Sequence, residues 1–156
     1  IVLIPGLFSW ADTVRLGKSV GALPNGRHAG EAISQGANPS VGFRRDGAVT
    51  AMAAAVASVQ PGYGNTAPLQ LEVDFGTLDN AQAEACLKAL IRSHFALGGT
   101  LMNINVVDKQ QILAASHNPE AYPDLIVRVT GFTAYFANLS PAFRKLVVER
   151  IVRQAS

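Results

Sequence analysis

The sequence predicts an α/β fold, because strand patterns alternate along the chain with helix signals. Residues 68–74 alternate apolar and polar side chains, which is typical of a strand. Residues 81–97 carry the apolar spacing of a helix, and residues 101–107 alternate again as a second strand. The 156 residues suit one domain or a large piece of one.

The first third of the chain contains further elements and one long loop. Residues 1–4 are apolar and predict a buried strand, and residues 9–20 predict a short helix. Residues 21–48 are rich in glycine, so we expect a loop there, and loops of this length in compact proteins are usually functional. Residues 49–59 are small and apolar and predict a tightly packed helix, and residues 61–65 predict a turn.

The chain starts without an initiator methionine, a basic leader region or a small-residue cleavage site. Its first apolar run is too short to cross a membrane. Because these residues look like a strand from the middle of a fold, we expect a fragment, a split subunit or a processed product.

The helix at 81–97 has signals at both ends. Asp79 and Gln82 have the spacing of a capping box, and Gly98-Gly99 predicts the helix end. The expected apolar face consists of Leu87, Leu90, Ile91 and Phe95.

The last third predicts two more helices around an apolar stretch. Asp108 caps a short helix that ends near His117, and residues 125–136 are apolar with Gly131 at their middle. Ser140 at the N-cap position and proline at the first helical position begin the last helix. Its expected face consists of Phe143, Leu146, Val147 and Ile151.

The composition excludes several classes of protein. Only 15% of the residues are charged and the net charge is +2, which is typical of a chain buried among other layers. No basic run is longer than Arg44-Arg45, so nothing indicates nucleic-acid binding. The single cysteine, Cys86, and the three histidines make no zinc spacing, and a reducing cytoplasm is the expected location.

Residues 126–134, with the sequence IVRVTGFTA, resemble the signature of the glycyl radical enzymes, the pyruvate formate-lyase superfamily. Four other segments resemble the family in its order: residues 21–31, 98–107, 118–125 and 138–141. The resemblance therefore covers nearly the whole chain.

The sequence departs from the family's pattern at four single positions and in two segments, residues 43–47 and 61–68. Thr130 stands where the family more often has Ser, Ala or Cys, and Phe132 stands where it mostly has Tyr. Ala32 and Gln35 replace the Pro and Asp of many dehydratase-like members. These differences leave the radical assignment in place, but they mean that no particular substrate follows from the resemblance.

The resemblance implies a fold and a division of the chain. We expect the C-terminal part of a ten-stranded α/β barrel of the glycyl radical enzyme type, with the radical-bearing loop inserted in the barrel. Residues 1–97 would be the C-terminal part of the pyruvate formate-lyase-like barrel, and residues 98–156 the glycine radical domain.

The resemblance also implies that Gly131 stores an organic radical. A glycyl radical is delocalised between the flanking amide groups, and without a Cβ its centre can flatten and a partner can approach closely. In the family, a radical S-adenosylmethionine activating enzyme with a 4Fe–4S cluster installs the radical, and we expect no cofactor bound in this chain. The alternative is that Gly131 only makes a turn or bulge within a strand.

In the family the glycyl radical passes to a cysteine thiyl several hundred residues upstream. We interpret Cys86, on the helix at 81–97, as a small buried apolar side chain. The thiyl would then come from a larger subunit or an N-terminal part of the enzyme. We expect this chain to be a small subunit or C-terminal fragment, inactive alone, of a lyase, dehydratase or acyltransferase that acts on a small organic substrate.

Two groups of residues complete the expected site. Arg128, Thr130 and Phe132 would support the radical loop, with Arg128 anchoring it or contacting the activating enzyme. Asn65, Thr66 and Gln70 are possible substrate-facing groups.

Several other polar residues have open roles. Asn103 and Asn105 could satisfy the backbone of the radical loop. Arg27 and Glu31 either bracket the site or form a plain loop salt bridge. Surface or core roles are expected for His28, His94 and His117.

Two other functions fit the same residues. The chain could be a repair subunit that replaces an oxygen-cleaved radical domain, or a structural domain that has lost the radical. The hundred residues upstream of the radical domain favour the catalytic interpretation over both of these. The chain would then be part of an oxygen-sensitive enzyme used in anaerobic metabolism.

Overall fold

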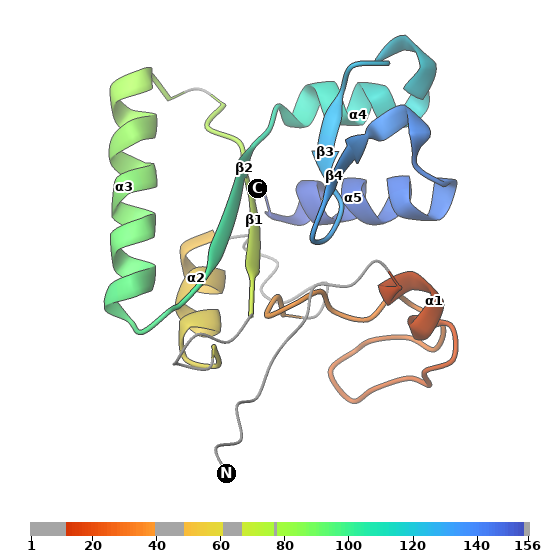
Figure 1. Ribbon diagram of the computed structural model, residues 1–156, viewed down its shortest axis with the longest axis horizontal. Helices are drawn as coiled ribbons and strands as arrows, with labels where there is room; N and C mark the ends of the chain where they lie inside the picture. Colours follow the sequence, from red (N-terminus) through yellow and green to blue (C-terminus); the bar gives the residue numbers. More distant parts are fainter. Residues whose placement is uncertain (1–11, 40–48, 61–66, 77, 155–156) are drawn as a thin grey trace.

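The computed structural model describes residues 12–39, 49–60, 67–76 and 78–154 (Figure 1). The strand expected at 1–4 and the turn expected at 61–65 lie outside these ranges. Helix α1, Thr13–Gly17, is shorter than the helix expected at 9–20. No helix in the described ranges is both long enough and apolar enough to cross a lipid bilayer.

A parallel pair of strands with a connecting helix forms the centre of the molecule. Strand β1, Leu69–Val73, pairs with β2, Met102–Val106, in a register that sets Leu69 opposite Met102. The chain passes between them through α3, Asn80–Ala96. Parallel strands need such a crossover. The prediction of an α/β arrangement is confirmed, and the closure of a ten-stranded barrel stays a prediction.

Both ends of α3 follow the sequence signals. The Gln82 backbone N–H donates to Asp79 Oδ1 at 2.8 Å, and the Asp79 N–H donates to Gln82 Oε1 at 3.3 Å, which completes the capping box. Gly98 follows the helix with a φ angle of +94°, a backbone conformation that residues other than glycine rarely adopt. The sequence therefore determines both boundaries of this helix.

The predicted face of α3 is wrong at its last position. Phe95 is 49% exposed, whereas His94 is fully buried and its Nδ1 lies 2.9 Å from the Ala53 carbonyl oxygen of α2, Val49–Ala57. A Cβ on Gly99 would lie 2.2 Å from His94 Nε2, so the bare glycine leaves room for the imidazole. The histidine therefore packs inward where the apolar spacing placed the phenylalanine.

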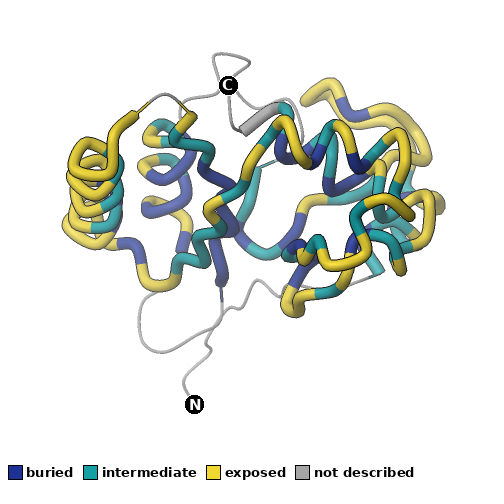
Figure 2. Tube along the Cα trace, turned by 90° about the horizontal axis from the view of Figure 1, so that it is seen from above, coloured by how far each residue is buried: buried dark blue, intermediate teal, exposed yellow. Residues whose placement is uncertain are grey.

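The interpretation of Cys86 as a buried side chain is also wrong, because its side chain is exposed. The buried or half-buried positions of α3 are Ala83, Leu87, Leu90, Ile91 and His94. Cys86 lies beside this stripe, on a helix that forms the outer layer of the molecule (Figures 1 and 2). A step of one residue, which rotates the side chain by about 100° around the helix, separates the exposed Cys86 from the half-buried Leu87. The sequence pattern did not resolve this difference.

The C-terminal half packs two helices around a small hairpin. The described elements are α4, Lys109–His117; η1, Pro119–Ala121; β3, Ile126–Arg128; β4, Thr133–Tyr135; η2, Phe136–Asn138; and α5, Pro141–Gln154. Asp108 caps α4, and Ser140 Oγ accepts from the Phe143 N–H at 3.4 Å at the start of α5. Both caps were predicted.

The buried apolar side chains form two clusters, one on each side of the strand pair (Figure 2). The first joins α2, β1 and α3 and includes Met52, Val56, Leu69, Leu71 and Leu90. The second joins α4, α5 and the hairpin and includes Ile112, Val127, Phe136, Val147 and Ile151. The hairpin is therefore fixed at its base by apolar packing, which leaves its tip to be positioned by other contacts.

Candidate functional site

Gly131 lies at the tip of the β3–β4 hairpin. The strands pair antiparallel, with Arg128 opposite Thr133 as the last pair, and the Val129 N–H donates to the Phe132 carbonyl at 2.9 Å. Gly131 lies beyond these pairs and is exposed. A glycine that only made a turn would occupy the same place. The groups around the loop must therefore distinguish a glycine that stores a radical from a glycine that only makes a turn.

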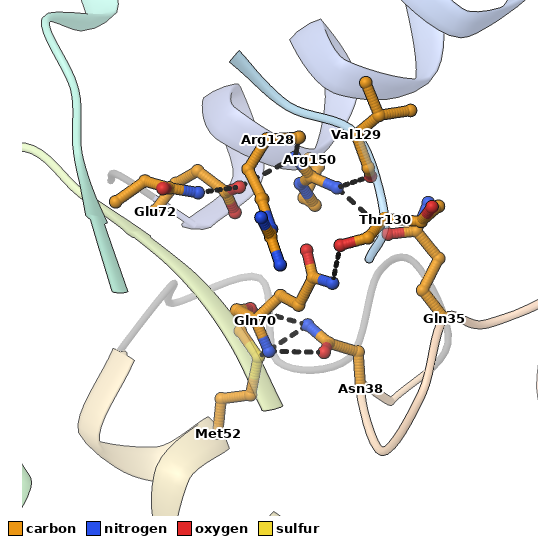
Figure 3. A network of polar contacts seen from close by, with 10 residues as sticks. Gln35, Asn38, Met52, Gln70, Glu72, Arg128, Val129, Thr130 and Arg150 are labelled. Atoms are coloured by element: carbon orange, nitrogen blue, oxygen red, sulfur yellow. Dashed lines mark hydrogen bonds and ion pairs between the residues drawn. The ribbon is translucent and has the colours of Figure 1, made fainter. Parts of the chain in front are cut away.

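The arm that leads into Gly131 is held by side chains from outside the hairpin (Figure 3). Three consecutive backbone carbonyls, those of Arg128, Val129 and Thr130, each accept a side-chain hydrogen bond. The arm is also dry, because Val129 and Thr130 are buried. On the other side of Gly131, the Phe132 side chain is 46% exposed, and the Phe132 carbonyl is held by the Val129 N–H of the first arm.

Arg150 of α5 binds the first two of these carbonyls. Its Nη1 donates to the Val129 carbonyl at 2.7 Å, and its Nη2 donates to the Arg128 carbonyl. Nη1 also donates to Gln35 Oε1 at 2.9 Å. The planar guanidinium with its fixed set of donors is suited to bind several acceptors at once. Arg150 therefore joins α5, the loop near Gln35 and the arm that leads into Gly131.

The charge of Arg150 is balanced by Glu72 of β1. Arg150 Nη2 and Glu72 Oε1 lie 2.7 Å apart, and Glu72 is 1% exposed. Asn105 Nδ2 donates to the same carboxylate oxygen at 3.4 Å. Burial raises the pKa of the Glu72 carboxyl, against the opposing effects of Arg150 and Asn105. The site thus contains a buried ion pair whose arginine also binds the backbone of the loop.

Gln70 of β1 binds the third carbonyl. Its side chain is fully buried, and Nε2 donates to the Thr130 carbonyl, which belongs to the amide that precedes Gly131. The backbone of Gln70 is held in turn by Asn38, which accepts from the Gln70 N–H at 2.8 Å and donates to its carbonyl at 2.7 Å. Asn38 therefore occupies the place of a neighbouring strand and fixes the position of Gln70.

The residues predicted to support the loop lie in or next to it. Thr130 is buried, Arg128 is partly buried and Phe132 is largely exposed. Of the possible substrate-facing residues, Asn65 and Thr66 lie outside the described ranges. Gln70 is described, and its Nε2 is engaged with the loop. The roles expected for these residues stay predictions.

The residues with open roles are now placed. Asn105 binds Glu72 rather than the loop backbone, so the expectation that it satisfies that backbone is wrong. The Arg27 guanidinium donates to the carbonyls of Gly17 at 2.9 Å and Gly21 at 2.8 Å, while the Glu31 carboxylate accepts from the His28 N–H. Arg27 and Glu31 therefore shape their own loop. His28 and His117 are exposed and His94 is buried, as expected.

Sequence reasoning missed four residues that matter here: Gln35, Asn38, Glu72 and Arg150. A signal for two of them was present. Arg150 stands among Leu146, Val147 and Ile151 on the buried face of α5, where a charge needs a partner. Glu72 carries the opposite charge and stands between Leu71 and Val73 in the predicted strand.

No group of three or more His, Cys, Asp or Glu side chains that could hold a metal ion occurs among the residues the structure describes.

Comparisons with known proteins match most of the chain. The family model described as Glycine radical matches residues 33–137. The isethionate sulfite-lyase of Nitratidesulfovibrio vulgaris is 32% identical over 139 residues, which cover 88% of this chain and 17% of that protein. Formate acetyltransferase 1 of Escherichia coli (strain K12) is 31% identical over 155 residues, covering 92% of this chain and 20% of that protein.

Among solved structures, a glycyl radical enzyme from Archaeoglobus fulgidus superposes with a TM-score of 0.80 at 34% sequence identity. The superposition covers 94% of this chain and 19% of that one. The chain thus spans about a fifth of the length of the proteins that it matches. The family model matches most of the residues of this chain, and the relatives are similar to the chain in sequence and, for the solved structure, in fold. This chain therefore belongs to the glycyl radical enzyme superfamily.

Proposed function

We propose that this chain stores a glycyl radical on Gly131 and passes it to a cysteine thiyl outside this chain. The enzyme would act on a small organic substrate by C–C cleavage or by radical elimination, as in a dehydratase. The observation that carries the proposal is the support of the arm before Gly131 by side chains from outside the hairpin. Buried side chains bind all three carbonyls before Gly131, while Gly131 itself stays exposed for a partner to reach.

Glycine suits this position for a steric reason. Removal of one hydrogen from its Cα leaves a centre that flattens, and no Cβ obstructs the flattening or the approach of a sulfur atom. The buried arm of Val129 and Thr130 would keep water from one side of the radical. Arg128, Thr130 and Phe132 would hold the loop in this arrangement.

Two partners follow from the proposal. A radical S-adenosylmethionine enzyme with a 4Fe–4S cluster would remove the hydrogen, and a larger subunit or an N-terminal part would carry the cysteine. Cys86 is a poor candidate for that cysteine, because it lies on α3, which the strand pair and α2 separate from the hairpin (Figure 1). We place the reaction in an anaerobic cytoplasm, since oxygen destroys glycyl radicals.

The proposal also includes the barrel fold and the division of the chain into two parts. Strands β1 and β2 pair in parallel through the crossover helix α3, which supports a larger ten-stranded barrel to which each part of the chain contributes a strand. We assign residues 1–97 to the barrel and residues 98–156 to the glycine radical domain. A repair subunit would need only the second part. Gln70 and Glu72 support the loop from the first part, so the catalytic assignment is preferred.

Electron paramagnetic resonance after treatment with the activating enzyme tests the proposal. The complete protein should give the doublet of a glycyl radical, and the Gly131→Ala variant should give none. Gly21→Ala is a matched control, because a Cβ on Gly21 would meet no atom within 4 Å, and this variant should keep the doublet. Absence of a doublet in the unsubstituted protein, with an activating enzyme shown to cleave S-adenosylmethionine, would overturn the proposal.

A further inference from the structure

The hydrogen bond between Gln70 and the Thr130 carbonyl has an electronic consequence for the neighbouring glycine. The Thr130 carbonyl and the Gly131 nitrogen belong to one amide group, and that nitrogen is bonded directly to the Gly131 Cα. We propose that Gln70 is a positioning residue that sets the spin distribution of the radical by polarising this amide. The inference rests on the function proposed above.

The physical argument starts from the nitrogen lone pair. A radical at the Gly131 Cα shares spin with its own carbonyl and, through the lone pair, with its own nitrogen. A donor on the Thr130 oxygen favours the resonance form in which the lone pair is drawn toward the Thr130 carbonyl carbon. Less of the lone pair then reaches Cα, so less spin density lies on the nitrogen.

The surroundings make this effect strong. Gln70 and Thr130 are both buried, and a hydrogen bond in a dry site polarises its acceptor more than one in water. Gln70 is also held in place, since Asn38 binds both its N–H and its carbonyl. Arg150 holds the two preceding carbonyls, so the arm that leads to this amide keeps its position when the Gln70 donor is removed.

The test compares Gln70→Met with the unsubstituted protein. Methionine is unbranched, of similar length, and lacks the N–H donor. Both proteins are made with nitrogen-15 glycine, activated as complete proteins, and examined by electron paramagnetic resonance and electron–nuclear double resonance. We expect a larger nitrogen-15 coupling at Gly131 in Gln70→Met, since the released lone pair shares more spin.

Gln60→Met is the matched control. Gln60 is also a buried carboxamide, and its Nε2 donates to the carbonyls of Ala67 at 2.5 Å and Leu101 at 2.7 Å, which lie outside the radical loop. Its substitution removes the same kind of group, so it should lower stability and leave the nitrogen-15 coupling unchanged. An equal change in both variants would mean a general effect of lost packing and would overturn the inference.

The remaining outcomes are also decisive. A doublet in the unsubstituted protein with the same or a smaller coupling in Gln70→Met would overturn the inference and leave the proposed function standing. No doublet in the unsubstituted protein would overturn both. If Gln70→Met does not fold, the unsubstituted protein made with nitrogen-15 in its glutamine side chains serves instead. A weak coupling from a glutamine side-chain nitrogen is then expected, and its absence would overturn the inference.

Discussion

Arg150 and Glu72 form a buried ion pair, with Nη2 and Oε1 2.7 Å apart, that joins the last helix to the first strand of the described sheet. The pair lies directly behind the loop that carries Gly131, and the same guanidinium binds the carbonyls of Arg128 and Val129. One side chain therefore connects the strand pair, α5 and the loop. This makes the loop sensitive to changes in elements far from it in sequence.

We predict that Arg150→Met destabilises the complete protein strongly. Removal of one partner of a buried ion pair leaves the other charge uncompensated, which typically costs about 3–5 kcal/mol. Chemical denaturation should show this loss in the free energy of unfolding. Arg150→Lys should be intermediate, because a single ammonium group cannot reproduce the bonds to two carbonyls, a carboxylate and Gln35.

The control for this prediction lies on the same helix. Lys145 pairs at 3.8 Å with Glu149, and both side chains are exposed. Lys145→Met should change the free energy of unfolding by less than about 0.5 kcal/mol, as for most surface substitutions. Equal effects of Lys145→Met and Arg150→Met would contradict the special position of Arg150.

The pKa of Glu72 gives a second prediction, which concerns pH. Burial raises this pKa in the folded protein, so the folded state holds the proton more tightly than the unfolded state. The resulting stability is fully present below the ordinary pKa of a glutamic acid and is lost as the pH rises through the raised value. In the Glu72→Gln variant no proton is exchanged at this position.

The free energy of unfolding measured against pH should therefore fall more steeply in the unsubstituted protein than in Glu72→Gln. The difference should be confined to the range between the ordinary and the raised pKa of the carboxyl. Parallel curves would show that Arg150 and Asn105 balance the burial of Glu72, and a steeper fall in Glu72→Gln would show that they outweigh it; either result would contradict the prediction.

Local signals in the sequence were sufficient for most of the described fold. The capping box at Asp79, the cap at Asp108 and the strand at 68–74 each depend on neighbours in the chain, and each is confirmed. The face of α3 depends on what packs against it. His94 is buried because Gly99 leaves room for its ring and the Ala53 carbonyl gives Nδ1 a hydrogen-bond partner. Both residues lie outside the periodic pattern of the helix.

The site was predictable only in part. The motif around Gly131 pointed to the loop as the candidate site, because the family resemblance is carried by local sequence. The groups that hold the loop come from Gln35, Gln70, Glu72 and Arg150, which the fold brings together across most of the chain. The alternation in residues 68–74 predicted a strand but not that Gln70 and Glu72 are buried against partners from other elements. Such pairing is a tertiary property.

The contact between Gly99 and His94 gives a third prediction. A Cβ at position 99 would lie 2.2 Å from His94 Nε2, so Gly99→Ala must displace the buried ring. Overpacking of this kind typically costs about 1–3 kcal/mol. Thermal unfolding should show a lower midpoint for Gly99→Ala, whereas Gly21→Ala, with open space around it, should unfold like the unsubstituted protein. An unchanged midpoint in Gly99→Ala would contradict the packing described for α2 and α3.

A fourth prediction concerns Cys86. Because its thiol is exposed on the outer helix, we expect it to take no part in radical transfer. Cys86→Ser should leave the amount of radical and the turnover per radical unchanged in the activated complete protein. If turnover stopped while the doublet remained, Cys86 would be the thiyl-forming residue, and the proposal that this residue lies outside the chain would be wrong.

The last prediction uses the exposure of Gly131. Molecular oxygen adds to a glycyl radical, and the resulting peroxyl species decays with cleavage of the backbone at that residue. Gly131 lies at the exposed tip of the hairpin, so oxygen can reach it without unfolding of the dry arm. Activated protein exposed to air should therefore lose a C-terminal piece that begins near Gly131, which mass spectrometry can locate.

Two controls make this cleavage specific. Protein that has not met the activating enzyme should survive the same exposure, and Gly131→Ala should survive it after activation, because neither contains the radical. Gly21→Ala should be cut like the unsubstituted protein, since its substitution leaves the loop unchanged. An intact chain after a verified doublet and full exposure to air, or a cut at another glycine, would place the radical somewhere other than Gly131.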